Sequence, residues 1–465
     1  MRPSSMARAV VLAAAVLAVC LTAAAWHAAP AAAAVDHAPD HATFFYDPST
    51  HEDEARAVAV GPDQSIYVAG TLWDPVNLSL DASLVKLSPV HAAQWLILNW
   101  GMANLRDSAS QVVVAGDGSV YIAGEMEFSD DVHAVFVRKY TAGGASIWLV
   151  LDYGLGHGQC YANDLKLDPD GNVLLAMQFR GPDGSDDAAL IKYSADGKQQ
   201  WVKKYAGPSH GDAVWYEIVT AGRQIYVVGT SDTISGVSRS LVARYTTAGQ
   251  RVWLHTTGTS SQRHRTLAAA NVPAGGVYAA GLKTGAGGRR GLLISYRADG
   301  GRRWVRTYAG RSGGERAEFL DVAVDPRNGR VALAGHSLHA GEGYWRFYVL
   351  MCNSNGARRW AYTQAPKVDA ADAYASEVQV SSTGHVYAAG SLETGSDDVA
   401  EDVYQTYVCE LTAAGSPVWF DWWPAAAVAR CDPADMALSG GSVHLVGTFT
   451  TSGGGTSQYV LSWED

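Results

Sequence analysis

Five carboxylic acids stand at equivalent positions in a segment that recurs along the chain, each directly before a short apolar run. They are Asp164, Glu217, Asp321, Glu377 and Asp435. If the repeats bring them together, their oxygens are the hard ligands that calcium prefers. Crowding of like charges would also raise their pKa values, as acid–base catalysis requires. The sequence favours a third, structural role, in which each acid accepts backbone N–H groups or pairs with a neighbouring repeat's cation.

The cations expected for such pairs also share one position of the repeat. They are Lys86, Lys139, Lys192 and Arg244.

Aromatic residues fall in the longer connections and form a second candidate site. Planar rings bury a large area at low entropic cost, so they suit a sugar- or peptide-binding platform. The candidates are Trp73, Tyr161, Trp215, Tyr216, Trp345 and Tyr374.

Catalytic motifs are missing from the sequence. There is no G-x-S-x-G elbow, no H-E-x-x-H helix and no P-loop. Catalysis would therefore need residues scattered among repeats.

The elements that must position these residues follow a long internal period. Seven tryptophans follow a Gly-rich turn at spacings of 51 to 59 residues: Trp95, Trp148, Trp201, Trp253, Trp304, Trp360 and Trp419. Each period holds four short strand-like runs, the second typically ending in x-x-G, as in IYVAG to Gly70. No helical period is sustained. This pattern predicts an all-β fold, a β-propeller of four-stranded blades.

The number of blades follows from the two ends of the chain. Eight second strands are present but only seven tryptophans, and the last unit, from Arg430 to Asp465, lacks an outer strand. Residues 41–47 (HATFFYD) stand at the right distance before the first unit to supply it. We therefore predict eight blades, closed by pairing the N-terminal strand with the C-terminal blade. Seven blades is the alternative, if the terminal pieces do not pair.

Loop lengths divide the predicted ring into two faces. Turns between first and second strands and between third and fourth strands are short and rich in Gly and Asp. The other two connections are longer and vary between units. Both long kinds lie on one face of a propeller, so we expect ligand contacts there and at the mouth of the central channel.

Two repeat families resemble this chain. DASLVKLSP (81–89) and DLKLDPDGN (164–172) resemble the seven-bladed β-propeller repeat of secreted bacterial proteins, the SBBP repeat. A G-x-x-x-W element is similar to the PQQ-like repeat of quinoprotein dehydrogenases; it runs from Gly144/Trp148 to Gly415/Trp419, with His91 replacing Gly in the first unit. The second resemblance implies tryptophans packed between adjacent blades. The adjacent Cys-Cys pair of those enzymes is missing.

The N-terminal segment has the composition of a secretory signal peptide. Arg2 and Arg8 precede an apolar run, and a tract of small residues follows. We expect cleavage after Ala34, one propeller domain over residues 35–465 and a secreted, extracellular protein. Lipoprotein anchoring at Cys20 is the weaker alternative, and no later segment is long and apolar enough to span a membrane.

Four cysteines remain after the leader: Cys160, Cys352, Cys409 and Cys431. They allow three disulfide pairings, and two bridges and buried free thiols stay open as alternatives.

Composition narrows the class of partner. A hydrophobic content of 48% with 17% charged residues excludes a disordered chain, and a net charge of −11 argues against nucleic acid. We therefore expect a monomeric, non-catalytic propeller without a cofactor, calcium excepted, that binds an extracellular protein, peptide or glycan. The alternative is a propeller enzyme, a lyase, glycoside hydrolase or quinone-dependent oxidoreductase, with its site at the channel mouth.

Overall fold

The structure is a computed structural model. It describes residues 35–36, 38–45, 52–99, 101, 105–129, 132–153, 159–208, 210–310, 316–338, 341, 343–365, 372–393, 404–423, 428–451 and 455–464. The predicted leader, residues 1–34, lies outside the described residues.

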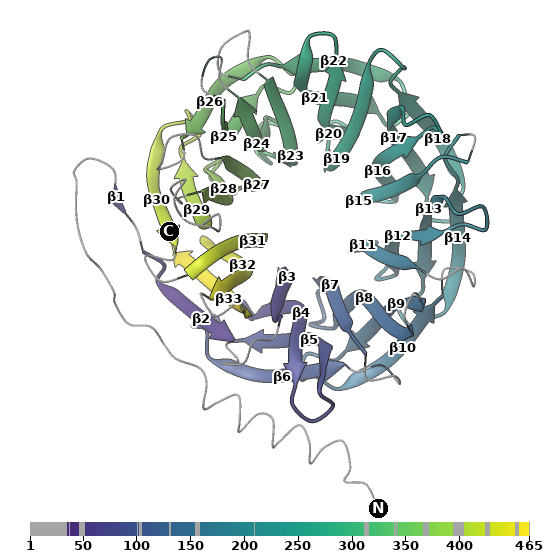
Figure 1. Ribbon diagram of the computed structural model, residues 1–465, viewed down its shortest axis with the longest axis vertical. Helices are drawn as coiled ribbons and strands as arrows, with labels where there is room; N and C mark the ends of the chain where they lie inside the picture. Colours follow the sequence, from purple (N-terminus) through teal and green to yellow (C-terminus); the bar gives the residue numbers. More distant parts are fainter. Residues whose placement is uncertain are drawn as a thin grey trace, which may run out of the picture.

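The described chain is all-β and forms a ring of eight antiparallel four-stranded blades (Figure 1). Each blade runs from an inner strand beside the central axis to an outer strand at the rim. The two-residue β1 (Val35–Asp36) lies outside the blades and pairs in parallel with the outer strand of blade 7. The described residues include no helix able to cross a membrane.

The strand bounds of the first four blades follow chain order. Blade 1 comprises β3 (Glu54–Val60), β4 (Ile66–Asp74), β5 (Ser79–Leu87) and β6 (Ala93–Asn99). Blade 2 comprises β7 (Asp107–Val114), β8 (Val120–Ser129), β9 (Val132–Tyr140) and β10 (Ser146–Asp152). Blade 3 comprises β11 (Cys160–Leu167), β12 (Val173–Arg180), β13 (Asp186–Tyr193) and β14 (Gln199–Tyr205). Blade 4 comprises β15 (Ala213–Ala221), β16 (Gln224–Asp232), β17 (Ser238–Thr246) and β18 (Arg251–Thr257).

The next three blades continue the same order. Blade 5 comprises β19 (Arg263–Asn271), β20 (Gly276–Gly285), β21 (Gly288–Arg297) and β22 (Arg302–Tyr308). Blade 6 comprises β23 (Arg316–Val324), β24 (Val331–Leu338), β25 (Trp345–Cys352) and β26 (Arg358–Gln364). Blade 7 comprises β27 (Ala373–Val380), β28 (Val386–Glu393), β29 (Tyr404–Leu411) and β30 (Pro417–Trp423).

Blade 8 joins the two ends of the chain. It comprises β31 (Val428–Ser439), β32 (Ser442–Thr451) and β33 (Thr456–Glu464), and its outer strand is the N-terminal β2 (His41–Phe45). β2 pairs antiparallel with β33, with His41 opposite Ser462 and Phe45 opposite Gln458. The predictions of eight blades and of closure by the N-terminal strand are confirmed; residues 46 and 47 of the predicted strand lie outside the described residues.

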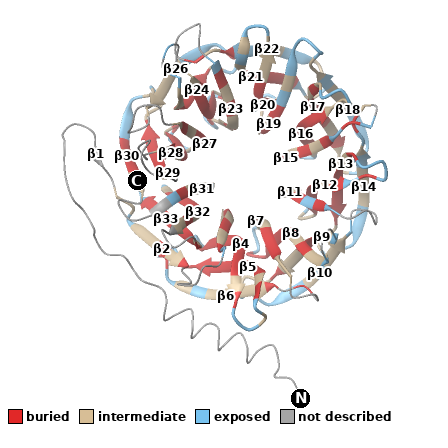
Figure 2. Ribbon diagram, viewed as in Figure 1, coloured by how far each residue is buried: buried red, intermediate tan, exposed pale blue. Residues whose placement is uncertain are grey.

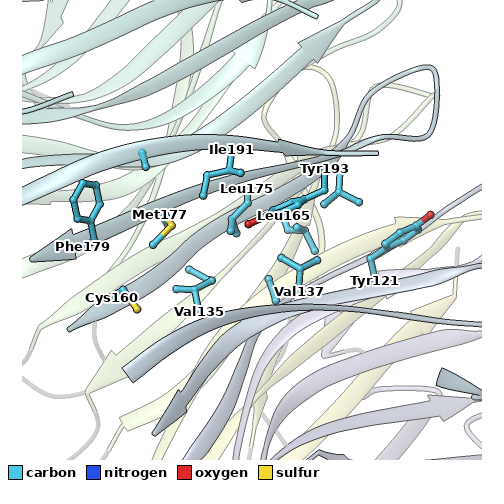
Figure 3. Close-up of a cluster of buried hydrophobic side chains, with 14 residues drawn as sticks. Tyr121, Val135, Val137, Cys160, Leu165, Leu175, Met177, Phe179, Ile191 and Tyr193 are labelled. Atoms are coloured by element: carbon cyan, nitrogen blue, oxygen red, sulfur yellow. The ribbon is translucent and has the colours of Figure 1, made fainter. Parts of the chain in front are cut away.

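Apolar side chains fill the space between blades. Burial is greatest in the second and third strands, and exposed residues gather on the outer strands and loops (Figure 2). Between blades 2 and 3, for example, Val135 and Val137 face Leu175 and Met177 across a dry layer (Figure 3). Burying each such side chain contributes roughly 1.5–3 kcal/mol, so neighbouring blades stabilise one another.

A glycine inside most second strands permits a β-bulge in the inner strand. The second strands continue past this glycine, for example β16 from Gly229 to Asp232, although the sequence predicted that they end there. All eight inner strands shift register at the residue that pairs with this position, for example between Trp215 and Glu217 opposite Gly229. A Cβ on Gly229 would lie 1.9 Å from the carbonyl oxygen of Val214, so any residue other than glycine would clash there. The bulge redirects the residue that follows it toward the central axis.

The outer-strand tryptophans of blades 1 to 6 each pack on the Gly of the G-x-x-x-W element in the next blade. A Cβ on Gly249 would lie 2.8 Å from the Trp201 ring, and one on Gly197 equally close to Trp148. The inter-blade role of the tryptophans is therefore confirmed. Six of the seven are half-buried; only Trp419, which stacks on Trp463, is 7% exposed.

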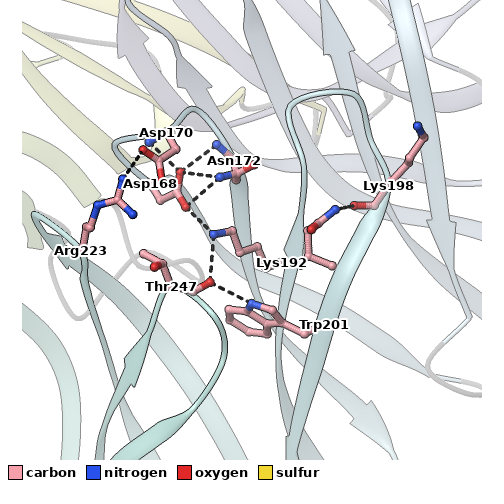
Figure 4. A network of polar contacts seen from close by, with 9 residues as sticks. Asp168, Asp170, Asn172, Lys192, Lys198, Trp201, Arg223 and Thr247 are labelled. Carbon is pink, nitrogen blue, oxygen red and sulfur yellow. Dashed lines mark hydrogen bonds and ion pairs between the residues drawn. The ribbon is translucent and has the colours of Figure 1, made fainter.

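The shared cation position reinforces the same contact. In blade 3, Lys192 Nζ and Trp201 Nε1 both donate to the Thr247 carbonyl of the next blade, at 3.0 and 3.1 Å, and Lys192 also pairs with Asp168 at 2.7 Å (Figure 4). Lys86, Lys139 and Arg244 reach the corresponding carbonyls. Pairing with these cations was one of two structural roles that we considered for the five acids. The structure does not show that pairing, because the cations point to the short turns.

The four cysteines, Cys160, Cys352, Cys409 and Cys431, are buried free thiols. Of the two alternatives, the structure has free thiols.

Candidate functional site

Bulges bring the five predicted acids to the central channel. Each follows the bulge of its inner strand, so we call this the axial position; it holds Asp164, Glu217, Asp321, Glu377 and Asp435 in blades 3, 4, 6, 7 and 8. Blades 1, 2 and 5 carry Ala57, Gln111 and Ala268 there. Four of the acids line a channel recess of about 220 Å³, together with Lys166 and Tyr216.

The three aspartates each bridge two blades. Asp164 accepts the N–H of Leu165 in its own blade and of Ile218 in the next, at 2.8 and 2.7 Å. Asp321 does the same with Val322 and Val378, and Asp435 with Met436 and Val58. Asp435 thus links the last blade to the first.

The two glutamates differ from the aspartates and from each other. Glu217 accepts the N–H of Ala269 in blade 5 at 2.5 Å. The corresponding donor for Glu377 would be the N–H of Met436, which already donates to Asp435. Within the described residues, the carboxyl group of Glu377 makes no hydrogen bond.

Lys166 supplies the one cationic side chain of the recess lining. Its Nζ lies 3.1 Å from Asp164 Oδ1, and this neighbouring negative charge raises the lysine pKa. One ammonium group faces several carboxyl groups, so the channel is acidic when all of them ionise.

Burial raises the carboxyl pKa values around the channel. It raises the pKa of Asp321 and of Asp435 to about 6 and that of Glu217 to about 8. The pKa of Glu377 rises well above its usual range, through burial first and then through the charges of Asp321, Asp435 and Glu217. Glu217, with a pKa of about 8, is mostly protonated at neutral pH, which removes one of the charges that repel Glu377.

These contacts favour the structural interpretation of the five acids. Backbone N–H groups already occupy both carboxylate oxygens of Asp164, Asp321 and Asp435, which leaves them poor ligands for calcium. In the part of the chain that the structure describes, no group of three or more Asp, Glu, His or Cys residues is placed to hold a metal ion. The described residues that line the recess include no histidine.

The six predicted aromatic residues do not form one platform. Trp215 is fully buried between blades 3 and 4, so the prediction that it is exposed is wrong. The bulge explains the error, because it reverses the side-chain direction between Trp215 and Glu217. Tyr216, the bulged residue itself, lines the channel recess.

The other four aromatic residues lie on the long-loop face. Tyr161 is 42% exposed and Trp73 is half-buried. Trp345 and Tyr374 are half-buried around His336, with ring centroids 4.5 and 5.0 Å from the imidazole. This trio is an edge-to-face aromatic cluster between blades 6 and 7 rather than an open surface.

The sequence analysis missed a second and larger cavity, on the short-turn face. It measures about 530 Å³ and lies between blades 5 and 6. Its lining includes Tyr278, Trp304, Arg303, Arg327, Asn328 and Asn355. A local charge count would have pointed to this sector: residues 263–364 contain sixteen Arg and Lys but six Asp and Glu, in a chain of net charge −11.

Comparisons with known proteins agree with the fold. A family model described as a domain of unknown function (DUF5122) beta-propeller matches residues 223–251, within blade 4. No curated protein matches the chain.

Solved structures with similar folds share little sequence with this chain. The Dos1 propeller aligns with a TM-score of 0.50 and 9% identity, over 91% of this chain and 95% of that one. The polysaccharide lyase Uly1 has a TM-score of 0.47 and 10% identity, over 90% and 91% of the two chains. Puromycin hydrolase has a TM-score of 0.48 and 14% identity, over 90% of this chain and 62% of that one. At these identities the comparisons show the fold alone: the chain is a β-propeller.

Proposed function

We propose that this chain is an exported, non-catalytic propeller that binds a protein, peptide or glycan partner through its long-loop face. The observation that carries the proposal is the position of the solvent-exposed large apolar side chains. Of the exposed large hydrophobic residues described, six lie on this face across blades 1 to 4: Val76, Leu78, Val132, Tyr153, Tyr161 and Ile234. Apolar surface left in water on one face is typical of a binding surface.

The channel supports the non-catalytic part of this proposal. General acid–base catalysis needs a pair of groups that are free to exchange protons with a substrate. Asp164, Asp321 and Asp435 instead hold adjacent blades together. Of the five axial acids, Glu377 alone makes no hydrogen bond with the described residues, and it faces a recess of only about 220 Å³.

Substitution of the most exposed loop residues tests the binding proposal. Leu78 is 71% exposed and Ile234 is 78% exposed, so Leu78→Asp with Ile234→Asp should remove apolar contact area without disturbing the core. Val90→Asp is the matched control, because Val90 is 64% exposed but lies in a short turn on the other face.

The measurement compares pull-downs from culture medium and envelope fractions, followed by titration of the captured partner. We expect wild type and Val90→Asp to retain the same partner, and the loop double variant to bind it at least about tenfold more weakly. Equal capture by all three proteins would refute the loop-face proposal. Turnover of the captured partner by the wild type would favour the enzyme alternative.

A further inference from the structure

The cavity between blades 5 and 6 takes the place of an ion pair found elsewhere in the ring. In blades 1 and 3 the cation position pairs with an acid of the first turn, as Lys86 does with Asp63 at 3.1 Å and Lys192 with Asp168 at 2.7 Å. In blade 5 the cation position, opposite Trp304, holds Ser295. A serine is too short to reach the next blade's turn, so the space beside that turn is vacated.

Polar groups near this space also lack the hydrogen bonds that their counterparts make in other blades. Ser295 is fully buried, and its Oγ has no hydrogen-bond partner in the described residues. The turn carbonyl that a lysine and a tryptophan share in other blades is that of Ser354 here, and it accepts from Tyr278 OH at 3.1 Å instead. Trp304 Nε1 makes no hydrogen bond with the described residues, unlike Trp201 Nε1.

Among the described residues, two arginines and no acidic residue line the resulting cavity, and the Arg327 guanidinium also lies against Gly384 in the first turn of blade 7. Arg303 Nη2 donates to the carbonyls of Ala274 and Gly275 at 3.3 and 2.9 Å, and its Nε and Nη1 make no hydrogen bond with the described residues. Arg327 is held by Asp325, whose side chain is 1% exposed, through Nε and Nη2 at 3.0 and 2.9 Å. Both arginines are therefore fixed in position with N–H groups left over.

The surroundings add to this positive charge. Blade 5, residues 263–308, contains nine basic residues and one acid, Asp299. Exposed arginines continue along the outer strands next to the cavity, at Arg302 in β22 and at Arg359 in β26. All but one of the sixteen basic residues in 263–364 are arginine, whose planar fork matches carboxylate, sulfate and phosphate groups.

We propose that the cavity between blades 5 and 6 binds an acidic polysaccharide. A sugar's anionic group is held by Arg303 and Arg327, and its hydroxyl groups bond Asn328 and Asn355. Trp304 and Tyr278 form part of the cavity wall but offer no free ring face for stacking. A volume of about 530 Å³ is in the range of small-ligand sites.

The observations favour a glycan over a nucleic acid. Single-stranded nucleic acids are bound through aromatic side chains on which bases stack. Among the described residues of blades 5 and 6, no large aromatic side chain is exposed, and the Trp304 ring lies between Gly356 and Arg306. This proposal concerns the face opposite the proposed loop-face site, so either can fail without the other.

The first test measures binding of a short oligogalacturonate, a sulfated dextran oligosaccharide and neutral dextran to the full chain. We expect both acidic sugars to bind, the neutral sugar not to bind, and Arg303→Gln with Arg327→Gln to weaken binding at least about tenfold, because charge-assisted hydrogen bonds are lost. Arg263→Gln with Arg316→Gln removes the same charge from exposed residues on the long-loop side of the same blades, and should change affinity less than about twofold. Equal losses in the two double variants would overturn the proposal.

The second test refills the cavity. Ser295→Lys places a lysine where Lys86, Lys139 and Lys192 stand, next to the Ser354 carbonyl. We expect this variant to lose oligogalacturonate binding although its positive charge is higher, whereas Ser295→Ala, the packing control, should bind like wild type. Unchanged binding by a folded Ser295→Lys protein would overturn the proposal.

A duplex oligonucleotide supplies the remaining comparison. Tighter binding of the duplex than of either acidic sugar, with equal sensitivity to salt, would overturn the glycan assignment in favour of nucleic acid. Melting temperatures of all variants show whether each is folded, and the Leu78→Asp, Ile234→Asp protein should bind oligogalacturonate normally.

Discussion

Among single residues, the axial glutamates Glu217 and Glu377 are buried carboxylic acids whose ionisation opposes folding. The aspartates of the ring are stabilised by two N–H donors each, whereas Glu217 has one and Glu377 has none among the described residues. Their raised pKa values mean that the folded chain holds protons that the unfolded chain releases. The protonated glutamates therefore contribute to the free energy of unfolding. This contribution is complete below their ordinary pKa, near 4.5, and is lost as pH rises.

Glu217→Gln should make this effect visible. The pKa of Glu217 is about 8, so the wild type loses stability between about pH 5 and pH 8, and the uncharged amide does not. Relative to wild type, we expect the variant to gain on the order of 2 kcal/mol in unfolding free energy over that range, less than the full shift implies because channel water screens the charge. Urea unfolding at several pH values is the measurement. A pH-independent difference would contradict the shifted pKa.

At the scale of strands, β2 has a greater structural role than its five residues suggest. It supplies the outer strand of blade 8, buries Phe45 and Thr43, and covers the exposed edge of β33. An uncovered strand edge also invites pairing with another chain.

A chain that starts at residue 48 should therefore be much less stable than one that starts at residue 38. The longer chain lacks only β1, which lies outside the blades, and should melt like the mature protein. Loss of β2 should lower the unfolding free energy by on the order of 3–5 kcal/mol and promote association at high concentration. Calorimetry and light scattering measure the two effects; matching melting temperatures would mean that β2 does not close the ring.

Strand-level features also explain what the sequence could reveal. The tryptophan period and the x-x-G endings predicted the blades because each has a local cause, the docking glycine and the bulge. The burial of Trp215 could not be predicted from the sequence. Side-chain direction in a strand is predicted from the alternation of successive residues, and a bulge interrupts that alternation. The cavity lies where blade 5 lacks the cation that blades 1 to 4 carry opposite the tryptophan, so Ser295 became informative only beside Lys86, Lys139 and Lys192.

For the molecule as a whole, ring closure uses different chemistry from the other blade contacts. Where blades 1 to 6 place a tryptophan on a glycine, blade 8 places His41 beside His91, with ring centroids 5.4 Å apart. His91 Nε2 and His444 Nδ1 both contact Ser462 Oγ, at 2.6 and 2.5 Å, and Thr43 contacts His91 Nδ1 at 3.2 Å. Glu464 lies 3.5 Å from His41.

This closure should weaken in acid. Burial lowers the pKa of His91 to about 3 and that of His444 to about 4, so both stay neutral in the fold but take up protons once unfolded. Their stabilising contribution is present above about pH 6.5 and is lost as pH falls, by up to about 1.4 kcal/mol per pH unit for each histidine.

Hydrogen exchange of β2 and β33 between pH 7 and pH 5 checks this prediction. We expect these strands to lose protection before those of blades 2 to 6, and His91→Gln with His444→Gln to flatten the pH dependence. Uniform loss around the ring would contradict a local weak point.

The pairing of β2 with β33 also fixes an order of events. The N–H of Glu464 donates to Asp40 across 424 residues of sequence, so β2 can pair with β33 only after all eight blades' other strands have been synthesised. Blades 1 to 7 can form from local segments while β2 has no strand to pair with. During that interval the β33 of another molecule is an equivalent partner, and chains that meet before closing would exchange their N-terminal strands.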